Sequence, residues 1–361
     1  MPIDVAKVVI AATLAFLVGI AMTPRLTYFL YSKRMWKKTA GKLASTGEVA
    51  EVFNALHADK ETKTPRLGGI IVWSATIATA LVIWLLAHFT QVPLFEKLDF
   101  ISRGQTWIPL AVLAAGALVG LVDDLLEIRL RPDGSYSKGL SLSLRLSFVG
   151  ALGLAVGTWF YGKLGISAIA VPLIGTVDLG LGYVLSLALI MVGLYAGGVI
   201  DGLDGLAGGV FSIAFGAYAA IAFSQGQYDL AALCATIAGA TLAFLWFNVP
   251  PARFYLSETG SMPLTITLGV VAFMADLGGK GSGISVLPIV AFPLIATAGS
   301  SLIQVLSKKI RGKKLFRVAP LHHHFEALGW PREKVVMRYW IISIVCALVA
   351  LVVTLVANHA R

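Results

Sequence analysis

Long apolar runs recur along the chain from near its first residue to near its last. Each run approaches the ~20 residues that a helix needs to cross the hydrocarbon core of a bilayer. The pattern therefore predicts an all-α polytopic membrane protein with about ten transmembrane helices. The predicted spans are residues 5–30, 68–90, 106–126, 144–162, 183–200, 205–224, 229–249, 262–277, 283–307 and 338–358.

One interval between the spans has a different pattern. Residues 166–182, ISAIAVPLIGTVDLGLG, alternate in polarity and are rich in β-branched side chains. This pattern predicts a short external β-hairpin or irregular loop rather than a further span. Because no repeat, low-complexity linker or separate soluble segment interrupts the spans, residues 1–361 are predicted to form a single integral membrane domain.

The composition supports a membrane protein and explains its basic charge. Hydrophobic residues make up 57% of the chain and charged residues 13%, against about 25% charged in soluble proteins. The net charge of +10 would suit a nucleic-acid-binding protein, but most of the 29 Lys and Arg residues follow odd-numbered spans. The positive-inside rule then places these loops in the cytoplasm and both termini outside. The basic charge indicates topology and a lipid bilayer as partner, not nucleic acid. Cys234 and Cys346 lie in apolar runs and are interpreted as core thiols.

Five carboxylates lie where spans are predicted to meet the cytoplasm. Asp123 and Asp124 end the third span in LVGLVDDLLEIRLRP, Asp201 and Asp204 follow the fifth in GGVIDGLDGLAGG, and Glu258 precedes the eighth in FYLSETGS. One such residue alone would be interpreted as a solvated helix cap. Five on one side indicate a functional site, because ionisable groups at membrane depth are costly.

Carboxylates facing basic loops are typical of a divalent cation that bridges anionic oxygens, and Mg²⁺ usually binds one or two carboxylates together with substrate phosphates. Lys60 and Lys138 are candidates for holding such phosphates, although both could equally anchor helix ends. The basic run 308–317 is better interpreted as an anchor. Gly202 and Gly205 alternate with aspartates, which favours a tight turn with exposed backbone N–H groups.

Three contiguous histidines, His322, His323 and His324, precede FEALGWP. Neighbouring side chains on a helix point about 100° apart, so all three cannot ligate one metal from a helix. They are interpreted as hydrogen-bonding groups for phosphate or sugar, with incidental loop histidines as the alternative.

Several motifs together resemble the phospho-N-acetylmuramoyl-pentapeptide transferase family along nearly the whole chain. They are HADK followed by TPRLGG, VDD, IDGLDGLAGG, LAFLWFNVPPARFYL, the GS of SETGS, and FRVAPLHHHFEALGWPREKVVMRYWIIS. The triple-His segment is the most specific, whereas TPRLGG leans toward sister polyprenyl-phosphate sugar-phosphate transferases. The resemblance implies ten spans with outward termini in the bacterial cytoplasmic (inner) membrane, and an active site facing the cytoplasm.

The resemblance also implies a reaction, in which the phospho-N-acetylmuramoyl-pentapeptide of a UDP conjugate moves to undecaprenyl phosphate. Lipid I and UMP are the products, and Mg²⁺ is the cofactor. Asp123 and Asp124 match a family pair that either activates the lipid phosphate or attacks as a nucleophile, and Glu258 replaces a metal-binding aspartate. By this resemblance the catalytic and metal-binding residues are Asp123, Asp124 and Glu258. The substrate-binding residues are Lys60, Lys138, Asp201, Asp204, His322, His323 and His324.

Four positions depart from the family pattern. Glu127 replaces a lysine, Glu258 an aspartate, and Tyr195 and Gly198 replace asparagines. Three alternatives therefore stay open beside an active transferase: a sister enzyme for a UDP-N-acetylhexosamine, a weakened paralogue that binds lipid or partner proteins, and a secondary transporter. The one-sided carboxylates and the lack of an inverted repeat argue against the transporter. Small residues on the span faces permit a homodimer.

Overall fold

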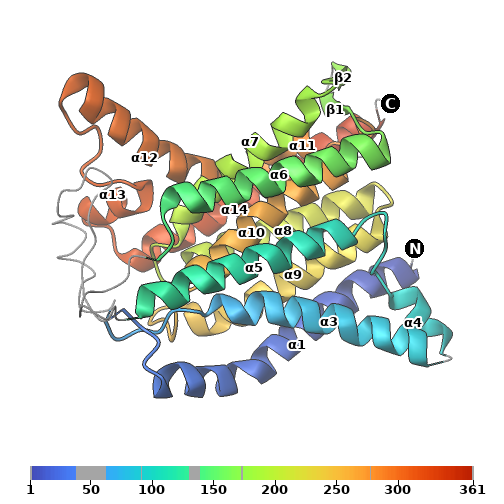
Figure 1. Cartoon of the computed structure of the whole chain (residues 1–361), viewed down its shortest axis with the longest axis horizontal. Helices are drawn as coiled ribbons and strands as arrows, with labels where there is room; N and C mark the ends of the chain where they lie inside the picture. The colour runs from blue at the N-terminus through green and yellow to red at the C-terminus, as the bar shows by residue number, and fades with distance from the viewer. Residues whose placement is uncertain are drawn as a thin grey trace.

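The computed structural model describes residues 2–37, 62–90, 92–129, 139–171, 174–276 and 278–359. Its elements are almost all helices, which run roughly along one common direction (Figure 1). The elements are α1 (Pro2–Ser32), α3 (Gly69–Phe89), α4 (Pro93–Leu98), α5 (Trp107–Ile128), α6 (Leu142–Leu164), β1 (Ala168–Val171), β2 (Gly175–Asp178), α7 (Gly182–Ala196), the 3-10 helix η1 (Gly197–Ile200), α8 (Leu206–Ser224), α9 (Tyr228–Asn248), α10 (Ser257–Ala275), α11 (Gly283–Val290), α12 (Phe292–Arg311), α13 (Leu321–Ala327) and α14 (Arg332–His359).

The predicted all-α polytopic architecture is confirmed. Across the described ranges, nine helices are long and apolar enough to cross a membrane. The tenth predicted span is the pair α11 and α12, which is bent by 63° at its break. Pro288 near the end of α11 and Pro293 at the start of α12 lack the N–H that a continuous helix would use, which explains the break.

Two spans begin earlier than the apolar pattern predicts. Helix α10 begins at Ser257 rather than 262, and α14 begins at Arg332 rather than 338. Their first turns, SETGS and REKVVMR, are polar or charged, so hydropathy does not mark them as parts of spans. The consequence is that Glu258 lies in the first turn of α10 and not in a loop.

The short hairpin predicted for residues 166–182 is also confirmed, while its external side stays a prediction. Strands β1 and β2 pair antiparallel, from Ala168 opposite Asp178 to Val171 opposite Gly175. The fully buried Asp276, at the end of α10, accepts a hydrogen bond from the N–H of Ala170 at 3.1 Å, which ties the hairpin to the helix bundle.

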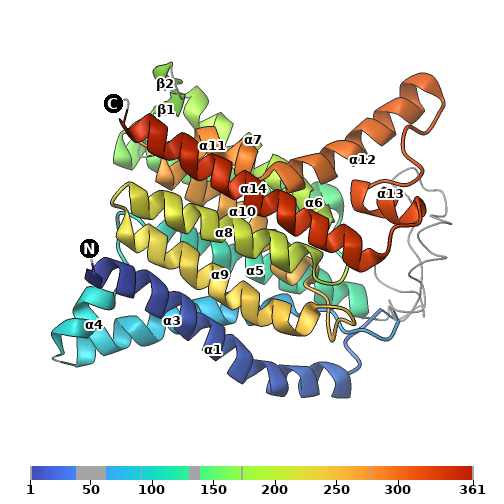
Figure 2. The ribbon, with the colours of Figure 1, turned by 180° about the vertical axis from the view of Figure 1, so that it is seen from behind.

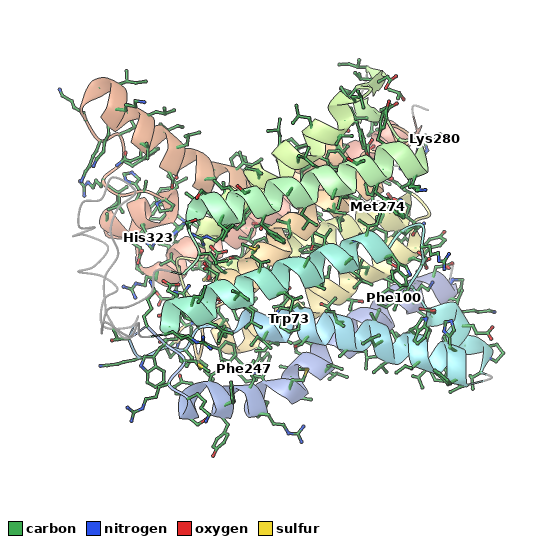
Figure 3. The ribbon with its side chains drawn as sticks, viewed as in Figure 1. Trp73, Phe100, Phe247, Met274, Lys280 and His323 are labelled. Carbon is green, nitrogen blue, oxygen red and sulfur yellow. The ribbon has the colours of Figure 1, made fainter. Side chains whose placement is uncertain are left out.

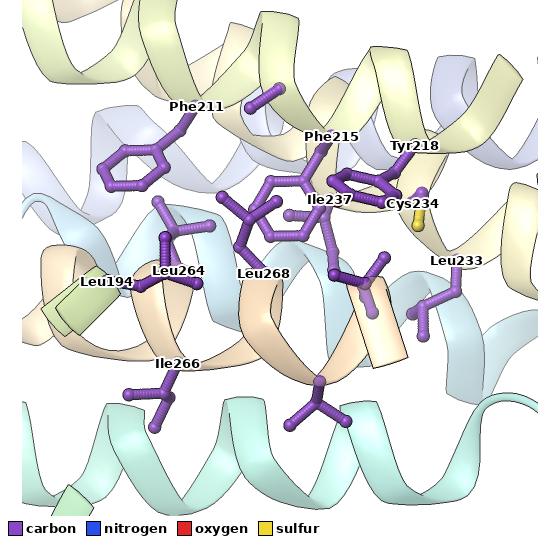
Figure 4. Packing of buried hydrophobic residues seen from close by; sticks show 14 of the residues in the cluster. Leu194, Phe211, Phe215, Tyr218, Leu233, Cys234, Ile237, Leu264, Ile266 and Leu268 are labelled. Carbon is purple, nitrogen blue, oxygen red and sulfur yellow. The ribbon is translucent and has the colours of Figure 1, made fainter. Parts of the chain in front are cut away.

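Helices α8, α9 and α10 form the centre of the bundle (Figure 4). Phe211, Phe215 and Tyr218 of α8 pack among aliphatic side chains of α9 and α10, such as Ile237 and Leu264. Every residue of α10 except Glu258 is buried. A helix that is buried around its whole circumference is typical of such a central position, and Glu258 is its one partly exposed residue.

The outer helices α1 and α14 carry many exposed large apolar side chains, among them Leu17, Ile341, Leu348 and Val352. Contiguous apolar surface of this extent is rare on a soluble monomer and marks a membrane-facing surface. Of the two free cysteines, Cys234 is buried as predicted, whereas Cys346 on α14 is partly exposed.

The two ends of the bundle differ in what they carry. The N- and C-termini, α4 and the hairpin lie at one end, and α13 lies at the other (Figures 1 and 2). Figure 3 shows His323 at the end opposite Lys280 and Phe100. The triple-histidine segment therefore lies at the end away from both termini.

Candidate active site

Close helix approaches bring three sequence motifs together at this end. A β-carbon at Gly69, in TPRLGG, would lie 2.2 Å from the backbone N of Gly260, in SETGS. A β-carbon at Gly120, just before the aspartate pair, would lie 2.2 Å from the backbone O of Glu258. Glycine at these positions lets α3, α5 and α10 meet at backbone contact, because any side chain would force the helices apart.

The start of α3 is further joined to the segment before α10. Three backbone hydrogen bonds of 2.9–3.1 Å connect residues 65–69 with residues 255–256. Leu67 and Ser257 next to these bonds have left-handed φ values of 73° and 57°. Non-glycine residues adopt this region at a cost that surrounding structure must offset, and they cluster at functional sites.

Asp124 is fully buried, and both oxygens of its carboxylate accept hydrogen bonds from neighbouring segments. Its Oδ2 accepts from the backbone N of Thr259 at 2.8 Å and from the hydroxyl of Thr259 at 2.6 Å. Its Oδ1 accepts from Nε of Arg66 at 3.1 Å and lies 3.0 Å from Nη2 of Arg66. Hydrogen bonds from several donors hold this carboxylate in one orientation.

Glu127 is part of the same cluster, although its negative charge differs from the family pattern. Its Oε2 lies 2.9 Å from Nη2 of Arg66, and its Oε1 lies 2.8 Å from Nζ of Lys37. Burial by itself lowers the pKa of the Arg66 guanidinium, but the carboxylates of Asp124 and Glu127 outweigh burial and raise this pKa above its ordinary value. Arg66 therefore stays charged, and the reversed charge at position 127 is offset by two cations.

A second arginine joins the remaining carboxylates. Nη1 of Arg145 donates to Oε1 of Glu258 at 2.5 Å and lies 3.6 Å from Oδ2 of Asp123. Oδ1 of Asp123 accepts from the backbone N of Leu140 at 2.6 Å. The hydroxyl of Tyr195 donates to Glu258 at 3.3 Å. Two of the positions that depart from the family pattern, Tyr195 and Glu258, are therefore in contact.

Three carboxylates are arranged so that they could hold a metal ion. Asp123, Asp124 and Glu127 each offer an oxygen, and these oxygens lie within 4.8 Å of one another. Carboxylate oxygens are the hard ligands that suit Mg²⁺ or Ca²⁺. Arg145 links Glu258 to Asp123, but Glu258 is not one of the three carboxylates in this group. Its role as a metal ligand therefore stays a prediction. Sequence analysis treated Glu127 only as a departure and did not propose it as a ligand.

The loop between η1 and α8 places one of its two aspartates at the site. Oδ2 of Asp201 accepts from the backbone N of Ser257 at 2.8 Å, next to Glu258. Oδ2 of Asp204 instead accepts from the backbone N of Ala252 at 3.2 Å, which ties the loop to the turn after α9. Both aspartates therefore help to fix this loop, and their substrate-binding role stays a prediction.

The histidines form the first turn of α13, and two of them cover the same loop. The rings of His322 and His323 are 4.2 Å apart and both are buried. A β-carbon at Gly202 would lie 2.3 Å from Nε2 of His322 and 2.9 Å from Nε2 of His323. Nδ1 of His324 accepts from the backbone N of Arg317 at 3.2 Å, on the more exposed side.

Gly202 and Gly205 both lie in the predicted turn, and Gly205 has a left-handed φ of 81°. Gly202 has a further role, because its lack of a side chain makes room for the two histidine rings. We expect Gly202→Ala to displace α13 and to lower the activity of the site by about 10-fold or more, because a 1 Å misplacement can cost this much. Initial rates in membranes would test this. Gly299→Ala is the control, since nothing lies within 4 Å of its added β-carbon, and native rates in Gly202→Ala would contradict the packing role.

Lys60 and Lys138 lie outside the described residues, so their predicted roles stay predictions. The structure adds Arg66, Arg145 and Thr259, which hold the carboxylates. Nε of Arg145 is buried and has no hydrogen-bond partner in the part of the chain that the structure describes. A buried donor in this situation is a natural contact for an anionic ligand.

Comparison with known proteins agrees with this fold and site. Residues 106–276, from α5 to the end of α10, match the family model described as glycosyl transferase family 4. The fold and the site thus define a polytopic membrane glycosyl transferase of that class. A phospho-N-acetylmuramoyl-pentapeptide-transferase from Geobacillus sp. (strain WCH70) is 33% identical over 349 residues, covering 95% of this chain and 96% of the relative. One from Desulfatibacillum aliphaticivorans is 33% identical over 312 residues, covering 81% of this chain and 80% of the relative. The chain belongs to the phospho-N-acetylmuramoyl-pentapeptide-transferase family.

Proposed function

We propose that the protein transfers phospho-N-acetylmuramoyl-pentapeptide from its UDP conjugate to undecaprenyl phosphate, releasing UMP and forming lipid I in peptidoglycan synthesis. An oxygen of the lipid phosphate attacks the sugar-linked phosphorus, a new P–O bond forms, and the bridging P–O bond to UMP breaks. The observation that supports this best is the convergence of Asp123, Asp124, Glu127 and Glu258 with Arg66 and Arg145 at one end of an apolar helix bundle.

Such a site suits phosphoryl transfer, where positioning and charge neutralisation supply most of the catalysis. The second pKa of a phosphate is about 6, so the lipid phosphate is mostly dianionic at neutral pH and needs placement more than a strong base. Nε of Arg145, which has no hydrogen-bond partner among the described residues, would donate to an anionic oxygen of the substrate. Asp123, held by Leu140 and Arg145, is placed to orient the attacking phosphate.

We further propose Mg²⁺ as the cofactor, held by Asp123, Asp124 and Glu127. The donor set fits, since all three ligands are carboxylates on successive turns of one helix end and lie within reach of each other. The bound cation would neutralise charge on the diphosphate. Arg66 contacts one oxygen of Asp124 and one of Glu127, which fixes the orientation of both carboxylates.

The rival sister activity differs from this proposal in the nucleotide sugar that the enzyme accepts. We expect purified protein to use UDP-N-acetylmuramoyl-pentapeptide at least 100-fold more efficiently than UDP-N-acetylglucosamine, measured as kcat/KM for UMP release. The names of the relatives that are 33% identical to this chain support the pentapeptide substrate. Preference for UDP-N-acetylglucosamine would assign the chain to the sister activity, and no release from either would favour a lipid-binding paralogue. The predicted homodimer is tested in the same preparation by light scattering.

We place the protein in the bacterial inner membrane with the site facing the cytoplasm. In a Cys234→Ala, Cys346→Ala background, Lys97→Cys in α4 should react with an impermeant thiol reagent in cells with a permeabilised outer membrane. Lys314→Cys, between α12 and α13, should react only after lysis. Both positions are exposed and lie at opposite ends of the bundle. Labelling in the reverse order would overturn this orientation.

A further inference from the structure

Helix α12 buries a polar stripe and exposes an apolar surface. The buried stripe recurs every three or four residues, so its members lie on one face of the helix; they are Thr297, Ser300, Gln304 and Ser307. Large apolar side chains lie on the remaining surface, where Leu302 and Ile310 are 61% and 78% exposed. Buried polar side chains need hydrogen-bond partners, and those of α12 find them in the segment that leads to α13.

Gln304 makes the largest share of these contacts. Its Oε1 accepts from the backbone N of Leu315 at 3.0 Å and from the backbone N of Phe316 at 2.9 Å. Its Nε2 donates to the backbone O of Phe316 at 2.8 Å. A carboxamide is suited to this position because it offers an acceptor oxygen and a donor nitrogen side by side. One side chain thus fixes two consecutive residues of the segment.

Two serines of the stripe hold the same segment at its ends. The hydroxyl of Ser307 donates to the backbone O of Lys313 at 2.9 Å. Oγ of Ser300 accepts from the backbone N of Leu321, the first residue of α13, at 2.9 Å. The position of α13 is therefore tied to α12 along the whole connection between the two helices.

The residues that Gln304 fixes also lie next to a histidine of α13. The rings of Phe316 and His324 are 5.4 Å apart in an edge-to-face arrangement. The backbone N of Arg317, one residue further on, donates to Nδ1 of His324 at 3.2 Å. A displacement of residues 315–317 would therefore be passed on to the first turn of α13.

The start of α12 supports the other side of the site. A β-carbon at Gly197, in η1, would lie 2.9 Å from the β-carbon of Leu294. Helix η1 leads directly into the loop that carries Asp201 and Gly202, and Gly202 lies against the rings of His322 and His323. Helix α12 thus contacts both the element before this loop and the segment before α13, so it sets the spacing between them.

We propose that Gln304 is a positioning residue for the nucleotide-sugar site. It holds the segment before α13 so that the histidines lie over the Asp201 loop at the spacing that the nucleotide sugar requires. This rests on the proposed function, in which the histidines and Asp201 bind that substrate. Gln304 acts through the backbone of residues 315–316, and its loss should affect the nucleotide sugar more than the lipid substrate.

The test uses two substitutions in the full-length protein in nanodiscs. Gln304→Met keeps the length of the side chain but loses all three hydrogen bonds. Gln304→Glu keeps an acceptor for the N–H groups of Leu315 and Phe316 but has no donor for the carbonyl of Phe316. We expect KM for UDP-N-acetylmuramoyl-pentapeptide to rise about 10-fold or more in Gln304→Met, since a displacement of about 1 Å can cost about 100-fold. The rise should be smaller in Gln304→Glu, and KM for undecaprenyl phosphate should stay near native in both.

Hydrogen exchange measures the tie itself, without turnover. The backbone N–H groups of Leu315 and Phe316 should exchange faster in Gln304→Met, because local opening of a segment becomes easier when its hydrogen bonds are lost. Exchange in α8, α9 and α10 should stay native, as should the melting temperature. Leu302→Met, which places the same new side chain on the exposed face of α12, is the matched control and should behave as native in every measurement.

Three results would overturn the proposal. They are native exchange at residues 315–316 in Gln304→Met, a native KM for the nucleotide sugar in that variant, and an equal rise in KM for both substrates, which a general loss of structure would cause. Calorimetric binding of UDP-N-acetylmuramoyl-pentapeptide separates this proposal from the proposed function. If the native protein binds the nucleotide sugar but releases no UMP, the proposed function fails, and weaker binding by Gln304→Met would still support the positioning role.

Discussion

Asp124→Asn is expected to lower kcat by about 10²- to 10³-fold, the range for removing one preorganised electrostatic contact. Asp124 accepts hydrogen bonds at both oxygens, from Thr259 on one side and from Arg66 on the other. Asparagine replaces one oxygen by an N–H₂ group, which would face one of these donors. The substitution also removes a carboxylate from the candidate metal group. The loss should therefore be accompanied by weaker Mg²⁺ dependence.

The measurement is the rate of UMP release at saturating substrates, with Mg²⁺ titrated in each variant. Asp178→Asn, an exposed aspartate of the hairpin at the other end of the bundle, is the matched control and should retain native rates. Detergent-solubilised yield and melting temperature would show that Asp124→Asn still folds. If a folded Asp124→Asn protein retained half of the native rate, Asp124 would be only a helix-end cap and not part of the catalytic site.

The second large effect is expected from Glu127→Lys, even though lysine is the residue that the family pattern has there. In this chain Glu127 contacts both Lys37 and Arg66. A lysine would place three cations together and withdraw a carboxylate from the cluster with Asp123 and Asp124. Like charges at this spacing repel. We expect kcat/KM to fall about 100-fold in Glu127→Lys, although this substitution restores the residue of the family pattern.

Glu127→Gln separates the two causes, because it removes the carboxylate without adding a cation and should lose less than Glu127→Lys. Glu96→Lys on α4 is the charge-reversal control at the opposite end. Higher activity in Glu127→Lys, alone or with Glu258→Asp, would show that the glutamates weaken a site that still follows the family pattern. A loss in both variants would show that the site is built around its glutamates.

The fold was largely predictable because membrane spans have a strong sequence signal. Ten apolar runs predicted the helices, and the alternating segment 166–182 predicted the hairpin that pairs as β1 and β2. What hydropathy did not predict was the start of α10 at Ser257 and the break between α11 and α12. Both depend on polar or proline residues at helix ends, where composition alone does not separate helix from loop.

The site was predictable in its residue types but not in its pairings. The sequence predicted that Asp123, Asp124 and Glu258 lie on one side. In the structure Arg145 joins Asp123 to Glu258, and Thr259 joins Asp124 to the start of α10. Lys60, Lys63 and Arg66 were predicted as cations that could offset the two glutamates, and Arg66 does contact Glu127, but no spacing rule could single it out from the three.

The most direct test of the whole account is the stoichiometry of the reaction in nanodiscs. Labelled UDP-N-acetylmuramoyl-pentapeptide and undecaprenyl phosphate are supplied with Mg²⁺, and UMP and lipid-linked label are counted together. The account predicts one UMP for each labelled lipid, dependence on both substrates and on Mg²⁺, and loss in Asp124→Asn. UMP formed without undecaprenyl phosphate, or labelled lipid that Asp124→Asn makes at the native rate, would contradict it.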